Sequence, residues 1–155
     1  MALAIAVTLH VLAVTIWVGG MFFAHQCLRP VAASQLDPPM RLRLWVGVFS
    51  RFFPWVWVAV VATLATGLWI IFFIFGGFAS TRLFVHIMFG LGLLMMAIFM
   101  LVYFSPYQRL KTAVAKENWQ DGGKQLARIR HLVGVNTIIG LLTIALASGG
   151  RYLIA

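Results

Sequence analysis

Long apolar runs separated by short polar segments make up most of the chain, and four of these runs are long enough to cross a bilayer. A membrane-spanning helix needs about 20 apolar residues, because each residue adds about 1.5 Å along the helix axis. The pattern predicts spans over residues 3–28, 52–75, 82–104 and 131–153. We therefore expect one all-α domain over residues 1–155, an integral membrane four-helix antiparallel bundle with interfacial helical extensions.

The polar segment between the first two spans contains the residues that end one helix and begin the next. Arg29-Pro30 closes the first span, because the charge leaves the hydrocarbon and the proline disfavours helix at the residue before it. Residues 40–53 follow a largely apolar pattern with Arg51 embedded, which is typical of an interfacial lead-in helix. Pro54 then falls in the first turn of the second span, where we expect a helix start rather than a kink.

Two further segments are expected to reverse the chain. Residues 76–81 begin with two glycines and predict a short turn, in which Ser80 or Thr81 can cap the third span. Residues 117–123 end in two glycines and predict the turn that leads into the fourth span. The third and fourth helices should therefore form a hairpin that projects beyond the bilayer.

Composition excludes several classes of protein. The mean hydropathy is +0.99, 63% of the residues are hydrophobic and 10% are charged, so lipid must be the solvent for most of the chain. Three acidic residues are too few for a broad carboxylate chemistry. The single cysteine, Cys27, excludes an internal disulfide and a cysteine-cluster metal site.

The net charge of +9 does not indicate nucleic-acid binding, because the basic residues lie between apolar runs rather than on one continuous face. An excess of Lys and Arg marks the cytoplasmic side of an inner membrane, and only Arg82 and Arg151 lie on the opposite side. We expect a multi-pass protein of the bacterial inner (cytoplasmic) membrane with both termini on the periplasmic side. The ten basic residues that set this orientation are Arg29, Arg41, Arg43, Arg51, Arg109, Lys111, Lys116, Lys124, Arg128 and Arg130.

The four histidines are the main candidates for chemistry, because an ionisable group inside a membrane span is costly. In the expected topology His10 and His86 lie near the outer ends of the first and third spans, so they share a layer. His25 and His131 lie near the inner ends of the first and fourth spans and form a weaker second layer. A histidine on each of two facing helices suits a metal ion or a haem b held between them.

Nearby polar residues can complete such a site. Arg82 lies one turn from His86 and could pair with a haem propionate, as Arg51 and Arg128 could in the inner layer. Asn136 could orient a ligand imidazole or a bound quinone, or make a plain interhelical hydrogen bond. The alternative for the histidines is structural, since an imidazole in a membrane helix can simply bind a neighbouring backbone group or Thr.

Soft side chains keep copper open as the alternative to haem. Imidazole mixed with thioether and thiol ligands suits Cu(I). Such a pathway would use His10, His86 and Met88, with Met21, His25 and Cys27 at the inner end of the first span.

The motif Leu9-His10, followed by Trp17-Val18-Gly19-Gly20, a histidine near the start of the third span and an arginine-rich entry to the last, resembles the CopD family of bacterial membrane proteins. It is similar, more distantly, to HemJ-type protoporphyrinogen oxidases. The CopD resemblance implies copper uptake or resistance, and the HemJ resemblance implies haem b. Both imply that His10 is a haem or metal ligand with His86 as its partner. The segment Gly134-Val135-Asn136-Thr137 departs from the HemJ pattern, which has Glu and Pro there.

Three functions follow from these observations. The first is a membrane haem b protein that transfers electrons, and it would act as an oxidoreductase with a quinone, a porphyrin or another donor or acceptor. The second is copper uptake or copper resistance of the CopD type. The third is a cofactor-free accessory subunit of a membrane complex. The residues leave open whether the protein forms a homodimer or part of a larger complex.

Overall fold

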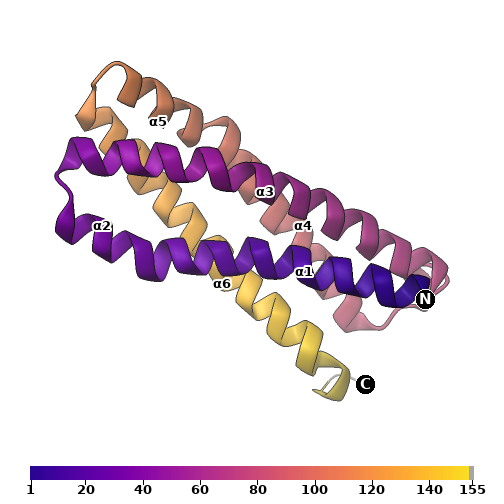
Figure 1. Ribbon diagram of the computed structural model, residues 1–155. Helices are drawn as coiled ribbons and strands as arrows, with labels where there is room; N and C mark the ends of the chain where they lie inside the picture. Colours follow the sequence, from indigo (N-terminus) through magenta and orange to yellow (C-terminus); the bar gives the residue numbers. More distant parts are fainter. Residues whose placement is uncertain (154–155) are drawn as a thin grey trace.

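The computed structural model describes residues 1–153 of the 155-residue chain, and almost all of this part is helical (Figure 1). Four helical segments of the described chain are long and apolar enough to cross a membrane, which confirms the predicted all-α four-helix architecture. In chain order the elements are α1 (Ala2–Phe22), the π-helical turn η1 (Phe23–Leu28), α2 (Arg29–Gln35), α3 (Pro38–Phe73), the short 3-10 turn η2 (Phe78–Ser80), α4 (Leu83–Phe104), α5 (Pro106–Ala115) and α6 (Trp119–Leu153).

The helices associate as two antiparallel pairs. The first pair is α1 with α3, and the second is α4 with α6, with α5 packed along the first part of α6. Helix α2 and the connection between α5 and α6 lie at one end, and α1 begins at the other (Figure 1). We call these the basic end and the N-terminal end. The two pairs touch mainly through α6, since α3 makes few contacts with α4.

Helix α3 corrects the prediction that a helix begins at Pro54. It runs unbroken for 36 residues from Pro38, with Pro54 in its interior. Trp45, Phe49 and Phe53 are buried on one face before the proline, and Val56 continues that face after it, whereas Pro54 itself is exposed. Burial of this continuous face offsets the backbone hydrogen bond that proline cannot make. The lead-in helix and the second span are therefore one element.

The turn between α3 and α4 forms where the glycines predict it, but it is not capped as expected. Gly76 and Gly77 have positive φ angles of 77° and 107°, which residues with a Cβ rarely adopt. The Thr81 hydroxyl donates to the Phe78 carbonyl at 2.8 Å and so closes the turn. Helix α4 begins after Arg82 without a side-chain cap. Neither Ser80 nor Thr81 takes the predicted capping role.

The predicted turn over residues 117–123 is shorter than expected. The chain reverses at Glu117, whose φ is +53°, and the Asn118 side chain accepts a hydrogen bond from the Asp121 N–H at 3.1 Å. Both glycines of the segment lie inside α6. A Cβ at Gly122 would lie 3.0 Å from Leu42 Cδ1, so the first of them permits close packing of α6 against α3 rather than a turn.

Aromatic side chains fill the half of the bundle nearer the basic end. Phe49 and Phe53 stack at 5.1 Å, and the Tyr107 ring meets Phe53 edge-on at 4.8 Å. Phe99 and Tyr103 of α4 join them. We call these five residues the aromatic cluster, and it joins α3 to α4 and α5. Edge-to-face pairs of this kind each contribute about 0.5–1.5 kcal/mol beyond the area that they bury.

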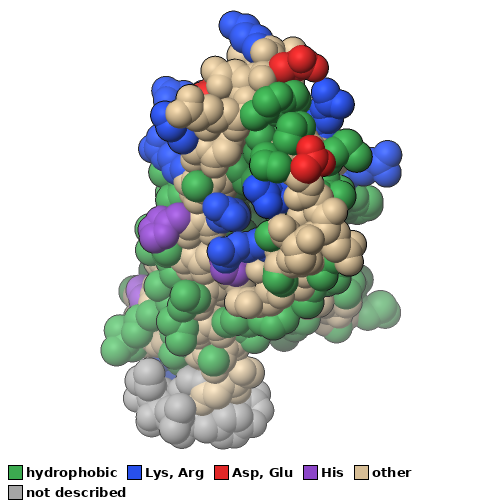
Figure 2. Space-filling view, turned by 90° about the vertical axis from the view of Figure 1, so that its left-hand side faces the viewer, with side chains coloured by type: hydrophobic (Ala, Val, Ile, Leu, Met, Phe, Trp, Pro, Cys, Tyr) green, Lys and Arg blue, Asp and Glu red, His purple; other side chains and the backbone are tan. Residues whose placement is uncertain are grey.

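The surface divides into an apolar belt and a charged end. Large apolar side chains remain exposed along all four long helices, as expected for a surface that faces lipid rather than water. Lys and Arg side chains gather at the basic end, seen face-on in Figure 2 with few acidic side chains among them. There the Arg43 guanidinium pairs with Glu117 at 3.3 Å and lies 5.3 Å from the Trp119 ring centroid, which ties α3 to the start of α6.

Candidate functional site: the N-terminal cavity

A cavity of about 530 Å³ lies between the two helix pairs toward the N-terminal end. Its walls come from α1, α3, α4 and α6 and are almost entirely apolar. It forms because the aromatic cluster stops short of this end and α3 and α4 make few contacts. A volume of this size is typical of a site for a small organic molecule and far exceeds the space that one water needs.

His10 is the one titratable side chain among the described residues that line this cavity. Its Nδ1 lies 2.9 Å from the Thr66 hydroxyl oxygen of α3. That hydroxyl has a single hydrogen, which it donates to the Ala62 carbonyl at 2.6 Å. With its hydrogen on Ala62, the hydroxyl accepts a hydrogen bond from His10, and the neutral ring then carries its proton on Nδ1. The lone pair on Nε2 is then free for a ligand.

Small residues let the His10 ring reach α3. A Cβ at Gly67 would lie 3.3 Å from His10 Cε1, so the ring packs directly on the helix backbone next to Thr66. Glycine in a membrane helix permits this close approach. The depth of His10 follows from the sequence, but its partner Thr66 does not. In the sequence, Thr66 is visible only as a hydroxyl-bearing residue within an apolar run.

The structure does not bring His86 to His10. His86 is exposed at the start of α4 and is not part of the cavity wall, although Val85 and Met88 are. Its Nδ1 lies 3.2 Å from the Arg82 carbonyl oxygen and 3.3 Å from the Thr81 hydroxyl. The Arg82 side chain is exposed and also lies outside the cavity wall. His86 is therefore held by its own turn rather than by the opposite helix pair.

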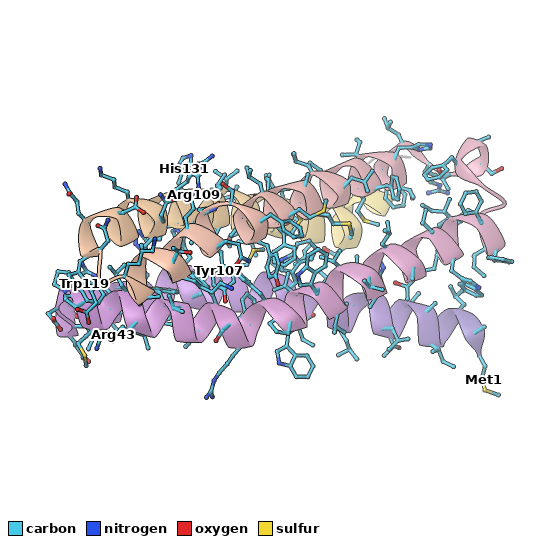
Figure 3. All side chains as sticks on the ribbon, turned by 90° about the horizontal axis from the view of Figure 1, so that it is seen from above. Met1, Arg43, Tyr107, Arg109, Trp119 and His131 are labelled. Carbon is cyan, nitrogen blue, oxygen red and sulfur yellow. The ribbon has the colours of Figure 1, made fainter. Side chains whose placement is uncertain are left out.

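The inner histidines lie apart from this cavity. His25 is half-buried and packs on α6, because a Cβ at Gly134 would lie 2.9 Å from its Nε2. His131 is exposed, and its side chain points outward from α6 (Figure 3). Arg51 and Arg128 are also exposed. The described residues contain no group of three or more His, Cys, Asp and Glu side chains that could hold a metal ion.

Asn136 is 2% exposed and lies in the middle of the bundle. Its Nδ2 donates to the Met95 carbonyl at 3.3 Å and lies 3.7 Å from the Met21 sulfur. Its Oδ1 has no hydrogen-bond partner among the described residues. Asn136 therefore links α6 to α4 and α1, on the side of the cavity that is nearer the basic end and away from His10.

The sulfur-bearing side chains that are candidate copper ligands are distributed unevenly over the bundle. Met88, Met95 and Met96 of α4 all line the cavity that His10 lines. Met21 is buried one layer closer to the basic end, and Cys27 is exposed. Sequence reasoning singled out Met88 alone among the methionines of α4, because a methionine in a membrane span is also an ordinary core residue.

Comparison with known proteins adds one match. A family model, CopD, described as copper resistance protein D, matches residues 46–149, which is more than half of the chain. The matched region covers most of α3 and all of α4 and α5 and leaves out α1, which carries His10. No curated protein and no solved structure matches the chain. These comparisons do not support the more distant resemblance to HemJ-type oxidases.

Proposed function

The chain belongs to the CopD family, and on this premise we propose that it binds copper in the N-terminal cavity and handles it within the membrane. The observation that carries the proposal is the His10 imidazole on the cavity wall, with its Nδ1 held 2.9 Å from the Thr66 hydroxyl oxygen. A neutral imidazole oriented by a hydrogen bond at its other nitrogen is the usual form of a histidine metal ligand.

The other cavity walls favour Cu(I) over harder cations. Thioethers are soft ligands, and Met88, Met95 and Met96 lie on the same cavity as His10. The described part of this wall holds no carboxylate, and oxygen ligands of that kind are what Mg²⁺ and Ca²⁺ prefer. Copper is the cargo in this proposal rather than a permanent cofactor.

The test is a Cu(I) titration of the purified protein against a chromogenic chelator. His10→Ala should weaken Cu(I) binding about 100-fold or more, because it removes a direct ligand. His86→Ala is the matched control, since His86 lies outside the cavity wall, and it should bind copper like the wild type. Both variants must elute as folded protein in detergent. Equal Cu(I) affinity of the two variants would contradict the proposal and favour the accessory-subunit function.

A haem b protein is the second candidate, supported by the size of the cavity. About 530 Å³ is more than a metal ion needs, and the imidazole lone pair of His10 is a suitable axial ligand. Because His86 and Arg82 lie outside the cavity wall, His10 would be the only histidine ligand and Arg82 would not pair with a propionate from its present position. A reduced-minus-oxidised visible spectrum with iron analysis distinguishes this candidate from copper handling.

A further inference from the structure

The contact between His25 and Gly134 fixes η1 against α6 near the basic end. The His25 Nε2 would lie 2.9 Å from a Cβ at Gly134, so the ring touches the α6 backbone where glycine leaves room. Residues one helical turn away on the same face of each helix must then lie beside this contact. These residues are Arg29, at the start of α2, and Arg130 on α6.

Both arginines stand on the basic side of the contact, because the two helices run in opposite directions. Arg29 is four residues after His25, close to one turn of the π-helical segment, and Arg130 is four residues before Gly134. Arg41 lies in the first turn of α3, at the same end of the bundle as Arg29 and Arg130, and the charges of Arg29 and Arg41 both act on Arg130. We call Arg29, Arg41 and Arg130 the arginine cluster.

No carboxylate of the described residues forms an ion pair with this cluster, although Asp37 lies one turn before Arg41 at the start of α3. The one ion pair of the described residues is Arg43 with Glu117, at the far tip of the α5–α6 connection. Arg41 and Arg130 are half-buried, so water screens their repulsion less than it would on an open surface. Like charges that converge at a partly buried point destabilise the fold unless an anion joins them. The cluster thus has the character of a ligand site rather than of a structural contact.

We propose that the arginine cluster binds a phosphate group, and that the phosphate is that of an anionic lipid headgroup. Guanidinium groups match phosphate oxygens in bidentate geometry. Arg29 directly follows the apolar segment of α1 and η1, and Arg130 directly precedes the apolar part of α6, so the cluster stands at the border of the apolar belt, where lipid phosphates are expected. The proposal is independent of copper binding, which concerns the opposite end of the bundle.

The test is the thermal unfolding midpoint of delipidated protein in a neutral detergent, with added phosphatidylglycerol, phosphatidylcholine or inorganic phosphate. Phosphatidylglycerol should raise the midpoint of the wild type by about 2–4 °C or more, and phosphatidylcholine should not. Arg130→Gln should raise the midpoint without any anion, because it relieves repulsion, and it should abolish the response to phosphatidylglycerol. If Arg130 were instead a structural residue, Arg130→Gln would lower the unfolding midpoint in the absence of the anion.

Arg128→Gln is the matched control, because it removes the same charge from an exposed position on the other side of α6. It should keep the full response to phosphatidylglycerol. Arg41→Gln repeats the test if Arg130→Gln fails to fold. A response to inorganic phosphate alone would identify free phosphate as the ligand of the same site. Equal responses of Arg128→Gln and the cluster variants, or no response of the wild type to any phosphate, would overturn the proposal.

Discussion

At the scale of single residues, a hydroxyl group orients the His10 imidazole. Carboxylates often hold metal-ligating histidines, but this chain has three acidic residues, Asp37, Glu117 and Asp121, and all lie at the basic end. The Thr66 hydroxyl would take this part in the proposed copper site, since it lies 2.9 Å from His10 Nδ1 and donates to the Ala62 carbonyl at 2.6 Å. A neutral hydroxyl does this without burying a charge in the membrane.

Thr66→Val tests that arrangement, because it keeps the shape of the side chain and removes its oxygen. The His10 ring should lose its fixed tautomer, and Cu(I) affinity should fall about 10- to 100-fold, as for other hydrogen bonds to metal ligands. Thr143→Val is the control, since Thr143 lines the same cavity and its hydroxyl binds the Ile139 carbonyl of its own helix. Unchanged Cu(I) affinity of Thr66→Val in a chelator titration would show that the hydrogen bond does not matter for binding.

At the scale of elements, the sequence predicts the four long apolar helices. It does not predict the contacts between them, nor the residue at which α3 begins. Apolar runs predict four spans because lipid requires every backbone group to be paired within its own helix. Periodicity also gives the depth of each histidine along its helix. It does not give the rotation of one helix relative to another, so His10 and His86 share a predicted layer although only His10 lines the cavity. Because that rotation is not known from the sequence, Thr66 cannot be identified from it as the partner of His10.

Two glycine pairs predicted turns in the chain, and one of these two predictions was wrong for a related reason. Gly122 and Gly123 resemble a turn in sequence, yet both are helical because packing against Leu42 selects a small residue at the first position. The glycines at positions 76 and 77 have no such packing role and form the predicted turn. Tertiary contact therefore decided which glycine pair bends the chain.

These two helical glycines give a matched pair of substitutions. Gly123→Ala should stabilise the protein by about 0.5–1 kcal/mol, because a Cβ there meets nothing within 4 Å and alanine favours helix. Gly122→Ala should lose this gain, since its Cβ would lie 3.0 Å from Leu42 Cδ1. Unfolding midpoints of the two variants in detergent measure the difference. A more stable Gly122→Ala would mean that Leu42 moves freely.

At the scale of the whole molecule, the two ends differ in charge and in packing. Two connections bring most of the Lys and Arg side chains to the basic end, where the aromatic cluster and α5 fill the bundle. The other end holds the start of α1, the 74–82 turn and the cavity. By the positive-inside rule we expect the basic end to face the cytoplasm, which would put the cavity near the periplasm.

Cysteine labelling tests this orientation in cells, because Cys27 is the only natural cysteine. In a Cys27→Ser background, Ser80→Cys at the turn before α4 should react with a membrane-impermeant maleimide added from the periplasmic side. Lys116→Cys, at the connection between α5 and α6, should react only in inverted vesicles. Reactivity of the two variants in the reverse sense would place the basic end outside the cytoplasm.

The few contacts between α3 and α4 have a consequence for how a ligand reaches His10. Local opening costs least where packing is sparse, so the part of the α3–α4 seam beside the cavity should open before the part that the aromatic cluster fills. Parting at that seam exposes the cavity sideways to the acyl chains of the bilayer. Molecules dissolved in those chains would then enter the protein laterally and meet the imidazole without first crossing an aqueous compartment.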